Sequence, residues 1–269
     1  MKSYAILLAA GTGSRTGFSV PKQLAKIKNK EIILHSLEIF TKSSINFNAV
    51  IIATPPPAVF GFNWSDFFKK NTADGDIKKL HIITGGKTRQ ESVGNGVKYL
   101  ESILTPEEKE NAALFIHDSA RPFVRDKELR LLLNKTAGYG AAFLCSMVTE
   151  TVKEINPGVE KRGDGGGGGE ETRAANYNRN EKVSRASLKL KTLARDNLIS
   201  AKTPQVFKFN IIKRALDEAA KTNFISTDDI SLVENLGLRA VPVLSTDFNI
   251  KITSALDVEI AELLYDKFK

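Results

Sequence analysis

The chain has 269 residues, of which 39 are Lys or Arg and 31 are Asp or Glu, giving a formal net charge of +8 at pH 7. This length allows one large domain or two small ones with a sizeable core. The positive charge does not by itself predict nucleic-acid binding, because the charges are mixed along the sequence and aromatic residues do not alternate with basic runs. Anionic small substrates explain the excess equally well.

Cys145 is the one cysteine of the chain and lies in the apolar run Ala141–Met147. A disulfide framework or a cysteine metal site within one chain is therefore excluded, and we expect Cys145 to be buried in a strand. The apolar run Ala5–Ala10 is too short for a signal peptide, and no other run approaches the length that spans a membrane. We expect a soluble, cytoplasmic protein that binds neither membrane nor nucleic acid.

The segment Leu7–Gln23, LLAAGTGSRTGFSVPKQ, is the most informative stretch. A strand predicted over Tyr4–Leu8 runs into small residues and glycines, which let a bound group approach the backbone closely. Arg15 and Lys22 follow, and cations beside successive backbone N–H groups suit a triphosphate. The alternative is an ordinary tight turn with two surface cations, because short motifs also occur by chance.

Strands and helices then alternate along the chain. Apolar runs predict strands over Ala49–Ala53, His81–Thr84, Ala113–His117 and Ala141–Met147. Apolar residues at helical spacing predict helices over Glu31–Phe40 and Arg89–Leu104. Thr88 and Glu91 have the spacing of a capping box for the second helix, and His35 on the first is interpreted as a packing residue. The alternation indicates an α/β protein with a mostly parallel sheet covered by helices on both faces.

A polar segment from Asn156 to about Leu190 interrupts this pattern and contains the unbroken run Gly165–Gly169. It has too little apolar surface to offset its ordering entropy, so we interpret it as a flexible insertion. A phosphate-binding glycine loop is the alternative, but neither a strand nor a helix pattern flanks the run.

Regular structure is predicted again from about Leu193. We expect helices over Phe209–Ala220, over Ser226–Leu236 with Ser226 or Thr227 as its cap, and over Leu256–Phe268. Pro242 interrupts the predicted strand Leu238–Leu244, which places that strand at an edge or a bulge.

Two better-known glycine motifs do not fit the N-terminal loop. Gly11, Gly13 and Gly17 imitate a dinucleotide-binding turn, but the next strand ends in Ile52-Ala53-Thr54-Pro55, without the carboxylate that would bind the ribose. No Gly-Lys-Ser or Gly-Lys-Thr sequence completes a P-loop. The lysine of this phosphate loop is instead supplied by Pro21-Lys22-Gln23.

Further polar motifs follow other predicted strands, where open α/β sheets usually bind their ligands. Gly85-Gly86-Lys87-Thr88-Arg89-Gln90-Glu91-Ser92 follows the third strand, and His117-Asp118-Ser119-Ala120-Arg121-Pro122 ends the fourth. With the N-terminal motifs, this ordered set resembles the cytidylyltransferases that act on 2-C-methyl-D-erythritol 4-phosphate in the non-mevalonate isoprenoid pathway. The resemblance continues through Thr203-Pro204-Gln205, Thr227-Asp228-Asp229 and Asn249-Ile250-Lys251-Ile252-Thr253.

The resemblance implies a Rossmann-like nucleotidyltransferase fold and a reaction of CTP with the sugar-alcohol phosphate that releases pyrophosphate and uses Mg²⁺. Arg15 and Lys22 match the family's transition-state stabilisers, and Arg195 and Lys251 match the residues that position the acceptor phosphate. Asp118 lies where it could meet the ribose or the metal ion. The positions matching CTP contacts are Ala9, Ala10, Gly11, Gly13, Gly86, Ser92, Asp118 and Ser119, and those on the acceptor side are Thr151, Arg195, Asp228 and Lys251.

The family also implies a homodimer, in which a projecting arm embraces a second subunit so that Thr151 and Arg195 act across the interface. We expect one domain over residues 1–269, with 147–194 as the arm that carries the insertion. Lys87 departs from the family, which often has an acidic residue there, and Ser254-Ala255-Leu256-Asp257 replaces the usual arginine-proline-acid sequence.

Alternatives remain at this stage. Arg195 and Lys251 could be solvated surface cations, Asp118 could be a helix cap, and Arg121 could be its structural ion-pair partner, which is the role we favour for Arg121. A cytidylyltransferase acting on ribitol 5-phosphate or another polyol phosphate is the nearest rival function. A non-catalytic nucleotide-binding protein is a rival of another class.

Overall fold

The computed structural model describes residues 1–11, 21–57, 61–156 and 189–268. These residues form two compact units, a main unit of Met1–Ser146 with Ala201–Lys269 and a second unit of Met147–Ser200.

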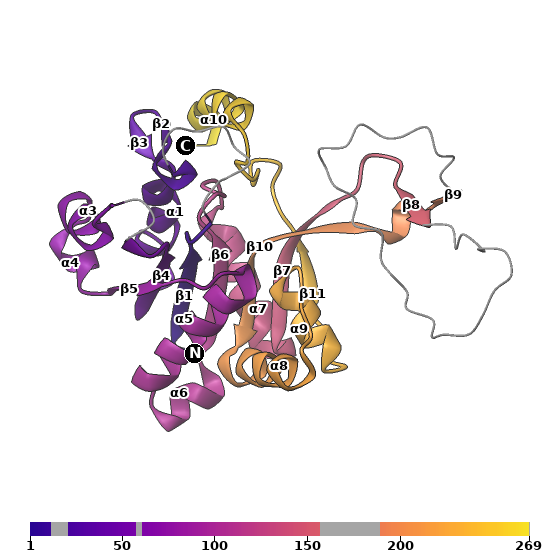
Figure 1. Ribbon diagram of the computed structural model, residues 1–269, viewed down its shortest axis with the longest axis horizontal. Helices are drawn as coiled ribbons and strands as arrows, with labels where there is room; N and C mark the ends of the chain where they lie inside the picture. Colours follow the sequence, from indigo (N-terminus) through magenta and orange to yellow (C-terminus); the bar gives the residue numbers. More distant parts are fainter. Residues whose placement is uncertain (12–20, 58–60, 157–188, 269) are drawn as a thin grey trace, which may run out of the picture. The chain divides into compact units, whose positions relative to one another are not determined.

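The main unit contains a seven-stranded sheet with the order β11-β7-β10-β6-β1-β4-β5 (Figure 1). Its strands are β1 (Ser3–Leu8), β4 (Ala49–Thr54), β5 (Leu80–Thr84), β6 (Ala113–Asp118), β7 (Ala141–Met147), β10 (Ile199–Lys208) and β11 (Val241–Leu244). β1 pairs in parallel with β4 and β6, β4 with β5, and β7 with β11, whereas β10 is antiparallel to β6. The carboxyl ends of β1, β4, β5 and β6 therefore meet at one edge of the sheet.

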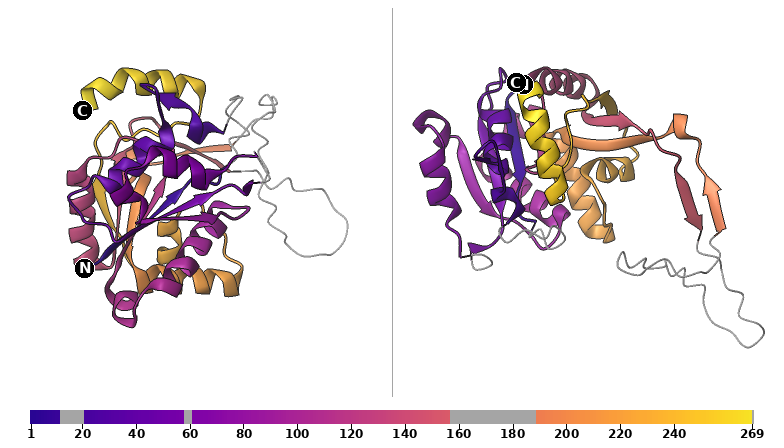
Figure 2. Two further views of the ribbon diagram at one scale, coloured as in Figure 1. Left: turned by 90° about the vertical axis from the view of Figure 1, so that its left-hand side faces the viewer. Right: turned by 90° about the horizontal axis from the view of Figure 1, so that it is seen from above.

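Helices lie on both faces of this sheet, as the two views in Figure 2 show. The main-unit helices that the structure describes are α1 (Ile32–Thr41), α3 (Trp64–Asn71), α4 (Asp74–Ile77), α5 (Arg89–Ile103), α6 (Pro106–Asn111), α7 (Asp126–Tyr139), α8 (Phe209–Thr222), α9 (Asp229–Asn235) and α10 (Ala255–Phe268). Side chains alternate along β1, so Tyr4 and Ile6 pack in a core with α5, α8 and α9. Ala5 and Leu7 pack in the opposite core with α1, α3 and α7.

A third, smaller core lies beside α10. It joins Ile27, Ile32, Phe123 and Ile252 to Ala261 of α10. The short elements on this side are the 3₁₀ helix η1 (Lys22–Leu24) and the strands β2 (Lys26–Ile27) and β3 (Lys30–Glu31).

The second unit contains an antiparallel hairpin of β8 (Lys153–Asn156) and β9 (Lys189–Thr192), followed by the 3₁₀ helix η2 (Arg195–Asn197). The predicted arm, 147–194, falls within the bounds of this unit. Most of the predicted flexible glycine-rich insertion, from Asn156 to about Leu190, lies outside the described residues, which stop at 156 and resume at 189.

The strands expected in the first 150 residues are confirmed to within a residue or two at their ends. Cys145 is buried in β7 as expected, and β11, with Pro242, lies at the edge of the sheet. His35 is buried and packs edge-on against Tyr265, with Nε2 hydrogen-bonded to the carbonyl oxygen of Ile27 at 2.9 Å.

One expected helix cap and one expected capping box differ from the observed ones. Asp228, not Ser226 or Thr227, caps α9, because its side chain accepts a hydrogen bond from the Ser231 amide. Thr88 caps α5 as predicted, but the Glu91 carboxylate accepts from the Lys87 amide at 2.7 Å.

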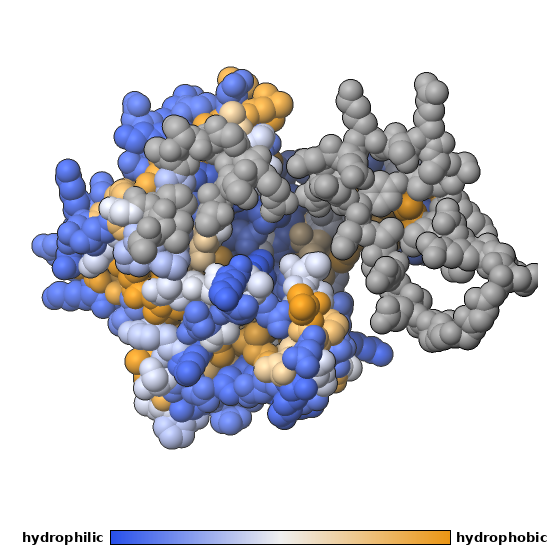
Figure 3. Space-filling model, viewed as in Figure 1, coloured by the Kyte–Doolittle hydropathy of each residue, from blue (hydrophilic) through white to orange (hydrophobic). Residues whose placement is uncertain are grey.

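Figure 3 shows mostly hydrophilic side chains on one face of the main unit, with apolar residues in small separate groups. In the parts of the chain that the structure describes, every helix is too short or too polar to cross a lipid bilayer.

Candidate active site

The backbone after β1 is held in place by Gln23 of η1. Nε2 of Gln23 donates to the carbonyl oxygen of Ala9 and, at 2.6 Å, to that of Gly11. The Gln23 side chain is almost fully buried, with the residue 2% exposed. This clamp fixes the start of the small-residue loop for which the sequence predicts a nucleotide contact.

The loop after β5 lies directly against the loop after β1. A Cβ atom at Gly85 would lie 2.3 Å from the Cβ atom of Ala10, so only glycine permits this approach. Ser92 Oγ accepts a hydrogen bond from the Gly86 amide at 3.0 Å and donates to the Thr88 carbonyl oxygen at 2.9 Å. The first turn of α5 therefore holds the glycine loop at the sheet edge.

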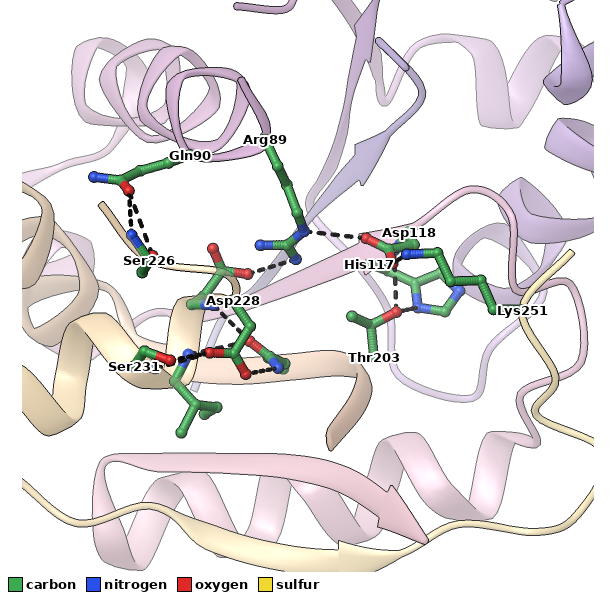
Figure 4. Close-up of polar contacts among 12 residues, drawn as sticks. Arg89, Gln90, His117, Asp118, Thr203, Ser226, Asp228, Ser231 and Lys251 are labelled. Carbon is green, nitrogen blue, oxygen red and sulfur yellow. Dashed lines mark hydrogen bonds and ion pairs between the residues drawn. The ribbon is translucent and has the colours of Figure 1, made fainter. Parts of the chain in front are cut away.

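The carboxyl end of β6 is fixed by a buried histidine. His117 Nε2 donates to the Arg121 carbonyl oxygen at 2.9 Å, which leaves Nδ1 to accept from the Thr203 hydroxyl at 3.0 Å. That hydroxyl in turn accepts from the Asp118 amide at 3.1 Å (Figure 4). Burial lowers the pKa of His117 to about 4, so the imidazole is neutral near pH 7 and keeps this tautomer.

The Asp118 carboxylate lies between two cations. Oδ1 accepts from Arg89 Nε at 3.3 Å, and Oδ2 accepts from Lys251 Nζ at 2.7 Å (Figure 4). Although burial alone would raise it, the charges of Arg89 and Lys251 hold the pKa of Asp118 well below its usual range. Arg121 Nη1 donates to the Asn249 carbonyl oxygen at 3.2 Å, while the ion pairs of Asp118 are with Arg89 and Lys251, so the structural role that we favour for Arg121 stays a prediction.

The motifs Thr203-Pro204-Gln205 and Thr227-Asp228-Asp229 interlock. Gln205 Oε1 accepts from the Asp229 amide at 2.9 Å and the Ile230 amide at 3.2 Å, while Nε2 donates to Asp228 Oδ2 at 2.8 Å. Asp228 Oδ1 accepts from the Ser231 amide at 3.0 Å. Both oxygens of Asp228 are thus engaged within the fold, and its contact with an acceptor stays a prediction.

A cavity of about 260 Å³ lies between the loops that follow β1, β5 and β6. The predicted site residues that line it are Ala10, Gly11, Lys22, Gly86, Ser92, Asp118, Ser119 and Lys251. A larger cavity, about 820 Å³, lies beside α3 and β5, but Lys69 is the one charged residue among the described residues that line it. Cations, a carboxylate and glycine backbone converge in the smaller cavity, which is therefore the better site for an anionic ligand.

Of the predicted site residues in the described part of the main unit, Ala9 and Asp228 are not among those that line the cavity. Ala9 is buried at the end of β1. Thr151 and Arg195 belong to the second unit, where Arg195 Nη1 donates to the Thr149 carbonyl oxygen at 3.0 Å. Gly13 and Arg15 lie outside the described residues.

Sequence reasoning missed Gln23 and Arg89, which also line the cavity. Gln23 stood in the motif with Lys22, but its clamp on two carbonyl oxygens depends on contacts 12 and 14 residues away. Arg89 follows the glycine turn Gly85–Thr88 at the end of a predicted strand. That position could have identified it as a candidate site residue.

The chain matches the family described as 2-C-methyl-D-erythritol 4-phosphate cytidylyltransferase over residues 3–162 and 180–267. Proteins of that name from Clostridioides difficile and Geobacillus thermodenitrificans are each 31% identical over 265 residues, which cover 98% of this chain and 94% and 97% of theirs. The crystal structure of the Francisella tularensis enzyme of that name has a TM-score of 0.70 and 27% identity, covering 98% of this chain and 99% of that one. The protein therefore belongs to the 2-C-methyl-D-erythritol 4-phosphate cytidylyltransferase family.

Proposed function

We propose that this protein transfers the cytidylyl group of CTP to 2-C-methyl-D-erythritol 4-phosphate, forming 4-diphosphocytidyl-2-C-methyl-D-erythritol and pyrophosphate for isoprenoid biosynthesis. The cavity lined by Lys22, Lys251, Asp118 and the glycine loops carries this proposal. It combines cations and exposed backbone at the carboxyl ends of parallel strands, which suits a nucleoside triphosphate.

A phosphate oxygen of the acceptor attacks the α-phosphorus of CTP, and the bond from that phosphorus to the departing pyrophosphate breaks. The nucleophile is already an anion, so the protein needs to supply position and positive charge rather than a strong base. Lys22 and Arg15 stabilise the charge that develops in the transition state. Lys251 and Arg195 orient the acceptor phosphate, while Ala9, Gly13, Thr151 and Asp228 complete the binding residues that we propose.

Mg²⁺ is the metal ion that we propose for this reaction. The described residues contain no cluster of three or more His, Cys, Asp or Glu that could hold a metal alone. Mg²⁺ is commonly bound by one or two carboxylates together with substrate phosphates, and Asp118 at the cavity fits that donor set. When bound, the ion neutralises phosphate charge.

We infer further that the protein is a cytoplasmic homodimer that pairs through the second unit, so that Thr151 and Arg195 serve the neighbouring subunit's site. Ile155 and Leu190 support this inference, because they face each other in the β8–β9 hairpin and are both exposed. The single cysteine is compatible with a reducing compartment.

The direct test measures pyrophosphate release in the presence of Mg²⁺. CTP, UTP, ATP and GTP are each paired with 2-C-methyl-D-erythritol 4-phosphate and with ribitol 5-phosphate. We expect turnover with CTP and the methylerythritol phosphate. A preference for ribitol 5-phosphate would keep cytidylyl transfer but change the acceptor, and no turnover with any pair would favour a non-catalytic nucleotide-binding protein.

A further inference from the structure

Arg89 lies between two carboxylates that come from distant parts of the chain. Its Nε donates to Asp118 Oδ1 at 3.3 Å (Figure 4). Its Nη2 donates to Asp229 Oδ2 at 2.8 Å. Arg89 is the first residue of α5, Asp118 ends β6, and Asp229 begins α9. One guanidinium therefore connects three elements at the edge of the cavity.

Asp229, one of the two partners of Arg89, is deeply buried. The Asp229 side chain is 1% exposed, and among the described residues its Oδ1 has no hydrogen-bond partner. Burial raises the pKa of Asp229, an effect that the positive charge of Arg89 opposes. A buried ion pair of this kind is weak evidence for stability, since apolar side chains of similar volume often stabilise a core as well or better.

The Asp118 carboxylate has a second cationic partner, Lys251, whose side chain is more exposed than that of Arg89. Lys251, whose side chain is 41% exposed, donates to the other Asp118 oxygen at 2.7 Å. A bound acceptor phosphate competes with Asp118 for this ammonium group, because both are anions. Once Lys251 turns to the phosphate, the ion pair with Arg89 remains to hold Asp118.

We propose that Arg89 is a positioning residue for cytidylyl transfer, and that Asp229 directs its guanidinium so that Asp118 stays in place while Lys251 exchanges Asp118 for the acceptor phosphate. This inference rests on the proposed function. Arg89 acts through Asp118 and Lys251 rather than on the reacting atoms.

Two variants separate positioning from simple stability. Arg89→Lys keeps one positive charge but lacks the planar fork that reaches two carboxylates. Asp229→Asn keeps the shape of the side chain and removes the charge that directs Arg89. Asp217→Asn is the matched control, because Asp217 forms an exposed i,i+4 ion pair with Lys213 at 2.6 Å on α8.

Each variant is assayed for kcat, for the KM of the acceptor, for CTP binding by calorimetry and for its melting temperature. We expect kcat to fall roughly 10- to 100-fold in both Arg89→Lys and Asp229→Asn, as small misplacements of reacting groups do. In Arg89→Lys the KM of the acceptor rises as well, because Asp118 then retains Lys251 more firmly. The Kd of CTP rises as well, because Asp118 is also a proposed contact of CTP, and Asp217→Asn resembles the wild type in every readout.

A folded Arg89→Lys enzyme with wild-type kcat and acceptor KM would overturn the inference, even if its melting temperature fell, since that pattern is what a structural bridge predicts. If Asp229→Asn does not fold, Arg89→Lys still decides the question. Wild-type protein that releases no pyrophosphate would overturn the proposed function first and this inference with it, so the two failures are distinguishable.

Discussion

Lys22 begins η1 and lines the cavity between the loops after β1 and β5. If it stabilises the transition state, Lys22→Ala should lower kcat by about 100- to 1,000-fold, as loss of one such donor typically does, while CTP still binds. Steady-state kinetics and calorimetry with CTP check this expectation. Lys26→Ala, at an exposed lysine nearby in sequence, is the control. Unchanged turnover in Lys22→Ala would remove the proposed mechanism.

The protonation of His117 should make the free energy of unfolding depend on pH. Burial lowers its pKa to about 4, whereas the unfolded chain keeps a pKa near 6.5. Between these values the unfolded state binds the extra proton, so the free energy of unfolding falls as the pH drops from about 6.5 to 4. The loss attributable to this group is on the order of 3 kcal/mol.

Urea unfolding at several pH values from 4.5 to 7 measures this effect. His117→Asn cannot take up the proton, so its free energy of unfolding should depend less on pH than that of the wild type. Carboxylates titrate in both proteins and cancel in the comparison. Equal pH dependence of the two proteins would contradict the assignment of a neutral, buried His117.

For single residues, the sequence predicted which ones lie at strand ends, but it did not predict their hydrogen-bond partners. Asp118 and Lys251 were both candidates from the sequence, yet the hydrogen bond between them spans 133 positions. The two links of Arg89, to Asp118 and Asp229, span 29 and 140 positions. Local patterns show which element a residue begins or ends, but such pairings depend on which strands become neighbours in the sheet.

Two glycines of α5 provide a matched pair at the scale of elements. A Cβ atom at Gly94 meets nothing within 4 Å, whereas one at Gly96 would lie 2.7 Å from Cδ1 of the fully buried Ile6 on β1. Gly94→Ala should raise the free energy of unfolding by about 0.5–1 kcal/mol through helix propensity. Gly96→Ala should lower the free energy of unfolding by about 1–2 kcal/mol. The clash of the new methyl group with Ile6 costs more than the gain in helix propensity.

Urea denaturation of the two variants at one pH checks this pair. Similar effects of the same sign in both would show that α5 does not pack on β1 at Gly96 as described. Activity serves as a second readout, because a shift of α5 would also move Arg89 and Ser92 at its first turn.

Elements with a clear apolar period were predicted well, and others were not. The strands β1, β4, β6 and β7 are buried runs that the sequence displays directly. β10 was not predicted, because it carries Lys202, Thr203 and Pro204 and becomes a strand through its antiparallel pairing with β6. α7 was also missed, since it begins with charged residues and buries only part of one face.

At the scale of the whole molecule, the question is what covers the β8–β9 hairpin. Ile155 and Leu190 are paired across it and are 42% and 53% exposed. A two-stranded hairpin is marginally stable by itself in water, so burial of this apolar pair by a second copy would stabilise it. We therefore expect the wild type to sediment as a dimer at micromolar concentration.

Ile155→Lys should shift that equilibrium toward monomer, because the charge would have to be buried at the interface. Turnover should fall with it, since Thr151 and Arg195 would no longer reach the neighbouring subunit's site. Leu238→Lys, at an exposed leucine of the main unit, is the control and should leave the dimer intact. Sedimentation velocity and pyrophosphate release are measured on the same samples. A wild type that stays monomeric and fully active would refute the shared site, whereas joint loss of dimer and turnover in Ile155→Lys alone would tie catalysis to this hairpin.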